Sequence, residues 1–379
     1  MIATYNTLGQ AVFRTLAAPS VVWRRGRERA QPAANVVISP LSIGVTLAMG
    51  FAAAAGETAA EMARALEFDV PRPDLFKANA DLLRHYGEGD APEGYRLRLA
   101  NALVLTQHGD AVAKSFRDLL ADSFAAEIFE GDVARVNQWV AQKTEGKIEG
   151  VLKDLPQDDI AVLVNAIYFK APWAKAFNPT LTYDGRFFLS GYDGVDVKMM
   201  HAVRDFVIVR GAGYRAARLP YKPPSLGMII VLPDTIEGLD AVLSVFNTAE
   251  LTRLRAEFER ETPAAFTLEL PRFRVRSEAS LKPALQRAGM ALAFDWTRAD
   301  FSGMTEGPPS EIPVAISDVV HCALVEVSEE GTEAAGATLK MFHIGGASPS
   351  FLVDRPFLFF IVDDATGAIL FQGRIVDPR

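Results

Sequence analysis

Residues 161–169 read AVLVNAIYF, a continuous apolar run with a single polar residue, Asn165, at its centre. Branched and aromatic side chains are enriched in strands, and a strand buried on both faces shows no alternation of polar and apolar residues. This run therefore predicts a central strand in a sheet that is covered on both sides.

The sequence before this run is mostly helical in pattern. Ser39 supplies an N-cap and Pro40 a first-turn proline for an apolar helix over residues 41–54. Residues 58–61 (TAAE) have the form of a capping box that opens a second helix. Apolar residues at helical spacing predict a third helix over residues 132–152.

After residue 169 the pattern is mainly that of strands. Further strands are expected at residues 206–209, 228–232, 266–270, 273–275, 321–327, 357–362 and 369–375. The last two flank Asp-Asp-Ala-Thr-Gly, which indicates a hairpin, and residues 277–289 are expected to form a helix that ends in glycine. Helices first and strands later favour a mixed α+β fold with large, mostly antiparallel sheets.

The composition is that of a folded globular protein. Hydrophobic residues make up 49% of the 379 residues and charged residues 23%, which excludes a disordered or collagen-like chain. Lys and Arg total 39 against 47 Asp and Glu, for a formal net charge of -8. A nucleic-acid or anionic membrane surface needs a basic field, so we expect neither nucleic acid nor membrane as a partner.

Cysteine usage and the first residues bear on the compartment. Cys322 is the single cysteine, which excludes an internal disulfide and fits a reducing environment. No basic segment precedes an apolar run near the start, and the apolar run at 43–55 is too short to span a bilayer. We therefore favour a cytoplasmic location and leave an extracellular one open.

The sequence contains no recognisable catalytic motif. Five histidines occur, and no two of them have a metal-ligand spacing: His85, His108, His201, His321 and His343. There is no Gly-x-Ser-x-Gly elbow and no Walker motif, and the loose Gly-rich match at 211–216 leads into prolines instead of a helix. We therefore expect no enzyme activity, no catalytic residues, no metal and no cofactor.

The most unusual segment is Glu-Glu-Gly-Thr-Glu-Ala-Ala-Gly-Ala-Thr at residues 329–338. It follows an expected strand, and about 20 residues pass without firm structure before the next one, as in functional or disordered loops. At a period of two, Thr332, Ala334 and Gly336 share one face. Small residues on one face could slip between existing strands over a packed core. The segment could therefore exist as a loop or as an additional strand.

With these features in place, the chain resembles the serpin family over essentially its full length. The resemblance rests on motifs in the family's order and spacing at residues 35–42, 165–173, 270–273, 285–294, 300–303, 329–338, 354–359 and 370–374. It implies a single domain over residues 1–379, with a bundle of helices around three β-sheets. The central sheet A would have five strands, and a reactive-centre loop would be exposed at about residues 329–350. The Ala- and Arg-rich usage favours a bacterial member of the family.

The resemblance implies a suicide-substrate inhibitor of serine proteases. The protease attacks the exposed loop, and after acylation the loop inserts into sheet A as a new strand and traps the acyl-enzyme. The segment that would insert first, the hinge, consists of Gly331, Thr332, Glu333, Ala334, Ala335, Gly336, Ala337 and Thr338. Counting from the hinge puts the reactive bond between Gly345 and Gly346, with Ile344 and His343 as alternatives. Glycine favours an elastase- or subtilisin-like target, and Phe342 would suit a chymotrypsin-like one.

Two further groups of residues are implied by the same resemblance. A polar cluster under the middle of sheet A, the shutter, would consist of Ser39, Ser42, Asn165 and His321. A latch at the top of the sheet, the breach, would consist of Trp173, Arg272 and Glu329, with a guanidinium–carboxylate pair.

Lys340 departs from the expected pattern, because it falls on the inward face of the inserting segment and must reach water or an acidic partner. It leaves open the alternative of a non-inhibitory serpin that acts as a carrier or chaperone. No basic stripe appears over residues 66–99, so we expect no heparin-type activator. We expect a monomer.

Overall fold

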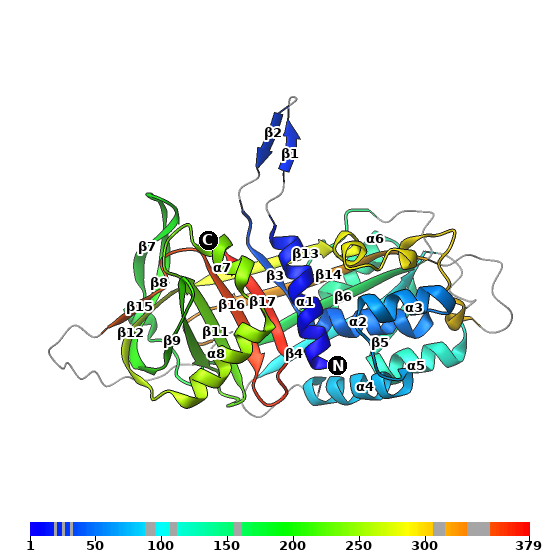
Figure 1. The fold of residues 1–379 in the computed structure, drawn as a ribbon, viewed down its shortest axis with the longest axis horizontal. Helices are drawn as coiled ribbons and strands as arrows, with labels where there is room; N and C mark the ends of the chain where they lie inside the picture. Colours follow the sequence, from blue (N-terminus) through cyan, green and yellow to red (C-terminus); the bar gives the residue numbers. More distant parts are fainter. Residues whose placement is uncertain are drawn as a thin grey trace.

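The computed structural model describes residues 1–18, 21–24, 27–30, 33–87, 95–106, 112–154, 161–305, 315–331 and 349–379. Figure 1 shows an elongated molecule, with most helices gathered around one half and a separate sheet closing the opposite end. No helix among these residues is both long enough and apolar enough to cross a bilayer.

Sheet A, the central sheet, has five strands in the order β13-β14-β6-β4-β5. These strands are β4 (Arg96–Leu105), β5 (Ala126–Glu130), β6 (Ala161–Lys170), β13 (Phe273–Ser280) and β14 (Ile316–Val327). β6 lies in the middle, which confirms the central strand predicted at 161–169. It pairs in parallel with β14 and antiparallel with β4.

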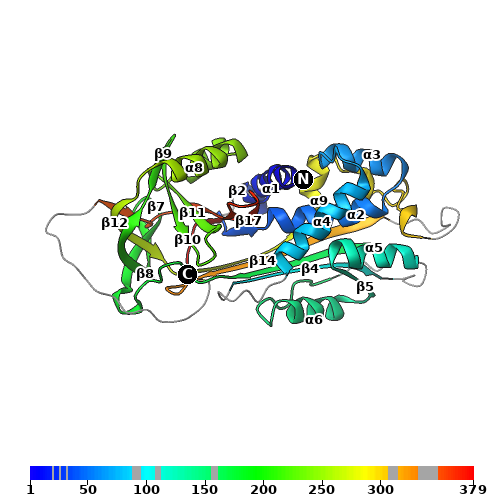
Figure 2. The same cartoon turned by 90° about the horizontal axis from the view of Figure 1, so that it is seen from below.

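Both faces of β6 are covered, by different helices. Leu163 joins the large hydrophobic cluster that includes α2 (Pro40–Ala53), whereas Val164 joins a smaller cluster with α6 (Val133–Lys143). Figure 2 shows α6 on one side of sheet A and α2 on the other. Burial on both faces explains why the sequence of β6 lacks the alternation typical of a half-exposed strand.

The remaining helices lie around sheet A and against the second large sheet. They are α1 (Ile2–Ala17), α3 (Gly56–Ala65), α4 (Arg72–Gly87), α5 (Lys114–Phe124), α7 (Leu239–Val245), α8 (Thr248–Arg260) and α9 (Lys282–Arg287). The longer ones precede β6 or lie beside the second sheet, in line with the early helical pattern of the sequence (Figure 1).

Two more large sheets complete the α+β fold. Sheet B has six strands in the order β3-β17-β16-β11-β10-β9, and sheet C has four in the order β15-β12-β8-β7. Sheet B comprises β3 (Val36–Ile38), β9 (Ile208–Gly211), β10 (Tyr214–Pro220), β11 (Leu226–Pro233), β16 (Phe357–Asp363) and β17 (Ile369–Ile375). Sheet C comprises β7 (Tyr183–Ser190), β8 (Asp193–Phe206), β12 (Ala264–Pro271) and β15 (Ser350–Leu352). The predicted hairpin is the antiparallel pair β16–β17.

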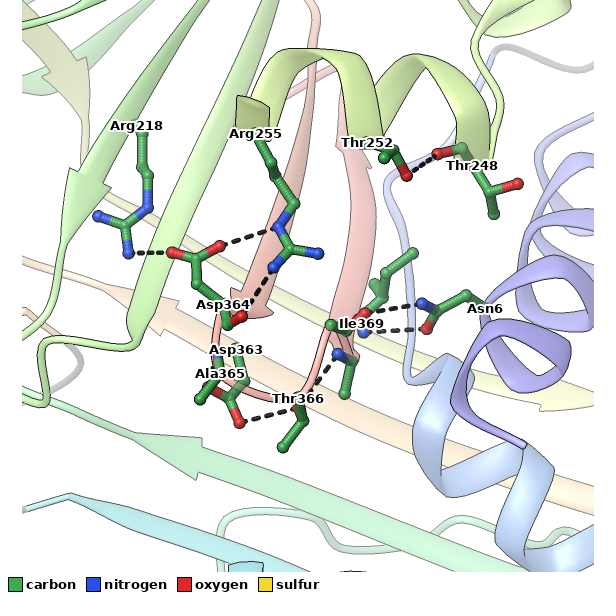
Figure 3. Close-up of polar contacts among 12 residues, drawn as sticks. Asn6, Arg218, Thr248, Thr252, Arg255, Asp363, Asp364, Ala365, Thr366 and Ile369 are labelled. Atoms are coloured by element: carbon green, nitrogen blue, oxygen red, sulfur yellow. Dashed lines mark hydrogen bonds and ion pairs between the residues drawn. The ribbon is translucent and has the colours of Figure 1, made fainter. Parts of the chain in front are cut away.

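The turn of this hairpin is fixed by side chains from three other elements (Figure 3). Asp364 accepts hydrogen bonds from Arg218 of β10 at 2.5 Å and from Arg255 of α8 at 2.9 Å. Asn6 of α1 donates to the carbonyl of Gly367 and accepts from the amide of Ile369, at 2.8 and 3.0 Å. The turn therefore joins sheet B to the first helix, although these segments lie at opposite ends of the sequence.

The second predicted helix exists as α3, but the capping box at 58–61 is wrong. The helix begins at Gly56, and its N-cap residue makes no side-chain hydrogen bond. Thr58 instead accepts a hydrogen bond from the amide of Asp300, and Glu61 accepts one from the amide of Leu292. Both side chains hold a distant segment, because tertiary partners compete with local capping.

The third predicted helix is shorter than expected. α6 ends at Lys143, because Glu145 and Gly146 adopt positive φ angles of 54° and 74° that terminate the helix. Ile148 still packs in the same hydrophobic cluster as Trp139. The apolar spacing beyond residue 143 therefore reflects the burial of these side chains and not a continuation of the helix.

Two further boundaries also differ from the prediction. The expected helix over 277–289 is wrong in its first part, since Ser277 to Ser280 continue β13 and pair with β14. Only α9 is helical there, and Gly289, with a φ of 95°, follows it. Residues 206–209, expected as one strand, belong to two: Phe206 ends β8 of sheet C, and Ile208 begins β9 of sheet B.

The sequence pattern also missed a short hairpin near the start of the chain. Strands β1 (Val21–Arg24) and β2 (Arg27–Ala30) form a separate two-stranded sheet. It projects from the body of the molecule (Figure 1).

Candidate functional site

The central feature of sheet A is a closed parallel seam between β6 and β14. Cα partners run along it from Val162 opposite Asp318 to Tyr168 opposite Leu324. Because β6 bonds directly to β14, no strand lies between them. The two strands are also far apart in the sequence, so their pairing depends on the whole fold.

A row of polar residues crosses the middle of this seam. His321 of β14 lies opposite Asn165 of β6, which in turn lies opposite Asn101 of β4. All three side chains are buried, with at most 1% of each residue exposed. Buried polar groups need hydrogen-bond partners, so this row requires a polar counterpart on the facing helix.

Helix α2 supplies that counterpart from its first turns. Ser39 is the N-cap, as predicted, and its hydroxyl accepts a hydrogen bond from the amide of Ser42 at 3.1 Å. Thr46 follows one turn later, and its hydroxyl is 3.0 Å from Oδ1 of Asn101. The spacing of three and four residues places these side chains on one face of the helix.

Hydrogen bonds connect the strands and the helix into one network. The amide group of Asn165 donates to the Ser42 hydroxyl at 2.5 Å and to Oδ1 of Asn101 at 2.8 Å. Its Oδ1 lies 2.7 Å from Nδ1 of His321, and the backbone amide of Ser39 donates to Nε2 of His321 at 3.0 Å. Since a backbone amide can only donate, Nε2 must be unprotonated and the proton resides on Nδ1.

This geometry keeps His321 neutral. Burial lowers the pKa of His321 from 6.5 to about 3. Protonation would charge a buried ring and would also remove the acceptor for the Ser39 amide. Because the unfolded chain binds this proton below about pH 6.5 while the folded chain does not, stability falls as the pH decreases from there towards about 3.

We expect His321→Gln to flatten this pH dependence. Wild-type protein should lose up to about 1.4 kcal/mol of unfolding free energy for each pH unit below about 6.5, relative to the variant. Urea unfolding at a series of pH values between about 6.5 and 4.5 measures the difference. Parallel curves for the two proteins would contradict a neutral histidine at this position.

A second polar group lies at the end of β14, above the seam. Glu329 is 4% exposed, and its Oε1 accepts hydrogen bonds from Arg272 at 2.6 Å and from the Thr182 hydroxyl at 2.5 Å. Burial acts to raise the pKa of Glu329, but the bonds from Arg272 and Thr182 outweigh it and lower the pKa. The carboxylate is therefore charged. It is held between Arg272, which follows β12, and Thr182, which precedes β7.

The backbone around Glu329 is tied to the segment that follows β6. The amide of Trp173 donates to the carbonyl of Glu330 at 3.0 Å, and the amide of Phe177 donates to that of Glu329 at 2.7 Å. The Trp173 indole donates to the carbonyl of Ser328 at 2.9 Å and stacks on Tyr221 with a centroid distance of 4.5 Å. These contacts hold residues 328–330 directly above the seam.

Gly331 completes this attachment, and only glycine fits there. It forms a β-bridge with Pro172 and has a φ of 120°, which other residues rarely adopt. A Cβ at this position would lie 2.4 Å from the carbonyl oxygen of Ala171. The chain is next described at Pro349, whose carbonyl accepts from the amide of Thr267, beside the parallel pair β12–β15.

The structure brings together two of the predicted groups of site residues. Ser39, Ser42, Asn165 and His321 form one hydrogen-bonded network, and Trp173, Arg272 and Glu329 meet at the end of β14. Gly331 lies beside the second group. The other predicted positions fall outside the described residues: Thr332, Glu333, Ala334, Ala335, Gly336, Ala337, Thr338, Lys340, Phe342, His343, Ile344, Gly345 and Gly346.

Three members of these networks were missed by the sequence reasoning. Asn101 sits in an apolar run, LANALVL, that has the same form as the run around Asn165, so its signal was present. Thr46 lies one turn beyond Ser42 on the same face of α2. Thr182 contacts Glu329 across 147 positions, and no local pattern indicates such a contact.

Comparison with known proteins identifies the arrangement. Residues 24–378 match the sequence profile of the family described as serpin (serine protease inhibitor). This chain belongs to the serpin family. Serpins are protease inhibitors and not enzymes, which confirms the prediction that this chain is not an enzyme.

Relatives and solved structures match this serpin over nearly its full length. Human serpin B8 is 37% identical over 362 residues, covering 91% of this chain and 93% of the relative. The leukocyte elastase inhibitor of pig (Sus scrofa) is 35% identical over 378 residues, covering 93% and 96%. Human thyroxine-binding globulin in complex with thyroxine has a TM-score of 0.83 at 25% identity, covering 99% and 97%. The last match confirms the predicted serpin fold.

Proposed function

We propose that this serpin inhibits serine proteases as a suicide substrate, with residues 1–379 acting as a single domain. A protease would cleave the loop between Gly331 and Pro349, and the hinge would then enter sheet A between β6 and β14. Insertion would trap the acyl-enzyme before water releases it. The closed parallel seam carries this proposal, because the start of the loop is tied at Gly331 directly above it.

The two polar groups support the same movement. An entering strand would separate His321 from Asn165, which are joined by a single side-chain hydrogen bond across the seam. Each still has partners on α2, since Ser39 contacts His321 and Ser42 contacts Asn165. The shutter would therefore stay hydrogen-bonded as the strands part, and the pair Arg272–Glu329 would act as the latch of the breach.

The sequence of the loop restricts the target protease. A reactive bond between Gly345 and Gly346 offers no side chain for a deep specificity pocket, which favours an elastase- or subtilisin-like enzyme. The similarity to a leukocyte elastase inhibitor supports the first of these. Cleavage after Ile344 or His343 remains compatible with insertion, because it shortens the inserting segment by only one or two residues.

Incubation with a panel of serine proteases tests the proposal. We expect an SDS-stable complex with at least one elastase- or subtilisin-like enzyme, together with release of a short C-terminal fragment. N-terminal sequencing of that fragment identifies the reactive bond. Protease whose active-site serine has been blocked serves as the control and should give no stable complex.

Cleavage without complex formation by every protease in the panel would contradict inhibition. That result would favour the alternative of a non-inhibitory carrier or chaperone, for which Lys340 on the inward face is the motivating feature. A carrier role also has a structural precedent, because thyroxine-binding globulin, a protein of the same fold, has been solved with thyroxine.

A further inference from the structure

The segment that follows α6 packs on the same face of sheet A as α6 itself, the face shown in Figure 2. Residues 145–149, called the strap from here on, leave the end of this helix. Ile148, within the strap, is fully buried in the hydrophobic cluster that α6 forms with the sheet. Just beyond the strap, the side-chain amide of Asn137 on α6 donates to the carbonyl of Leu152 at 2.9 Å and accepts from its amide at 2.8 Å. The strap is therefore a packed element of the fold.

One row of side chains on this face shows what the strap crosses. Arg98 of β4 lies opposite Tyr168 of β6. Tyr168 lies opposite Leu324 of β14, which in turn lies opposite Arg276 of β13. Tyr168 and Leu324 belong to the same hydrophobic cluster as Ile148, so the row lies under the strap. The closed seam passes through the middle of the row, between Tyr168 and Leu324.

On the β4 side of the seam, the strap is held by Glu145. Its Oε1 lies 3.6 Å from Nη1 of Arg96 and 3.6 Å from Nε of Arg98. The φ of Glu145 is 54°, a left-handed conformation that residues with a Cβ rarely adopt. The two arginines therefore hold this carboxylate in place at a position where the backbone itself is unfavourable.

On the other side of the seam, β14 and β13 hold the strap at further points. Nζ of Lys147 lies 3.6 Å from Oε2 of Glu326, and the Oε1 of Glu326 lies 2.9 Å from Nε of Arg274. Arg274 also donates to the carbonyl of Lys147 at 3.3 Å, and Arg276 donates to the carbonyl of Glu149. The strap is thus attached to the sheet on both sides of the seam.

An additional strand in the seam would pull these attachments apart. Arg98 and Arg276 lie on strands that are three spacings apart, or about 14 Å, and a strand between β6 and β14 would increase this to about 19 Å. A hydrogen bond does not survive an increase of about 5 Å between its partners. The strap must therefore release the sheet on at least one side before the two strands can separate.

We propose that the strap is a salt-sensitive restraint on the opening of the seam between β6 and β14. The side chains of its ion pairs are between 26% and 57% exposed, so dissolved ions reach them and screen their attraction. Gly146 and Gly150, with φ angles of 74° and 65°, border residues 147–149 and provide points about which this segment can turn. The restraint is a property of the uncleaved protein, and its effect on the speed of loop insertion rests on the proposed function.

Alkylation of Cys322 in the uncleaved full chain measures release of the strap. Cys322 is the single cysteine, is fully buried, and belongs to the same hydrophobic cluster as Ile148. The neutral reagent iodoacetamide therefore reaches it only when this cover moves. We expect the alkylation rate to rise at least about threefold between about 0.1 and 1 M KCl, since the Debye length falls from about 10 to 3 Å over that range.

Two variants each remove the charge that holds one side of the strap. Glu145→Gln and Glu326→Gln should each raise the alkylation rate at least about threefold at low salt, and the double variant should respond to KCl less than about 1.5-fold. Glu259→Gln removes the same charge at an exposed position on α8, beside sheet B, and should stay within about 1.5-fold of wild type. A urea series below the unfolding transition separates release of the strap from global unfolding, because only global unfolding depends steeply on urea.

The result that overturns this restraint differs from the result that overturns inhibition. An alkylation rate that is insensitive to salt and equal in wild type and all variants would refute the restraint, even in a protein that inhibits proteases. A steep dependence on urea at every concentration would refute it as well, because Cys322 would then be exposed only by global unfolding. Faster alkylation of the Glu145→Gln and Glu326→Gln variants, without inhibition of any protease, would support the restraint and contradict the proposed function.

Discussion

Cleavage of the proposed reactive-centre loop is expected to raise the melting temperature of this serpin by more than about 10 °C. An inserted strand of about 14 residues would form on the order of ten to fifteen new backbone hydrogen bonds, at about 0.5–1.5 kcal/mol each. The gain is on the order of 10 kcal/mol, which is comparable to the stability of an ordinary domain. An entropy of unfolding of about 2.1 cal/mol/K per residue amounts to about 0.8 kcal/mol/K for 379 residues, so the expected shift is about 13 °C, which is easily measured.

Calorimetry of intact and nicked protein, with the cut placed in the loop by a non-target protease, measures this shift. The proposed site of insertion adds a second observable, because a strand between β6 and β14 must replace their direct pairing. Backbone amides of both strands should therefore remain protected from hydrogen exchange after cleavage, with the inserted segment newly protected. Unchanged melting and an unprotected segment after complete cleavage would rule out insertion.

The strands of the core were the most predictable part of the fold. Burial of β6 between α2 and α6 produces an uninterrupted apolar run, so its sequence carries the signature of its environment. The hairpin β16–β17 was predictable for a similar reason, because a short polar turn separates two buried strands. Element boundaries were less predictable where exposed residues alternate, as in β13, which borders one edge of sheet A and was partly taken for helix.

In the candidate site, too, residues marked by their sequence neighbours could be predicted, whereas contacts between segments far apart in the chain could not. Ser39 could be identified as an N-cap from its neighbour Pro40, and Asn165 stood out in its apolar run. The contact of Thr182 with Glu329 and the second role of Thr58 depend on segments far away in the sequence. The β1–β2 hairpin was missed because each of its strands has only four residues, the shortest run in which alternation can indicate a strand.

Under the proposed mechanism, Thr332→Arg is expected to turn inhibition of the protease into simple cleavage of the loop. On the two-residue period of the loop sequence, position 332 would enter sheet A facing the core, as the first residue after Gly331, which is bridged to Pro172. Burying an unpaired guanidinium there would cost several kcal/mol at the first step of insertion. Hydrolysis of the acyl-enzyme would then be faster than insertion, and the stoichiometry of inhibition should rise more than about tenfold.

Glu333→Arg is the matched control, because the same side chain is introduced one position later on the opposite face. It should leave the stoichiometry within about twofold of wild type, because at this end of sheet A the face away from α2 carries partly exposed charged side chains, Arg274 and Glu326. The cleaved Thr332→Arg protein should also lack the rise in melting temperature, which links loss of inhibition to failed insertion. Equal effects of the two variants would show that charge in the loop, and not the face on which it lies, governs inhibition.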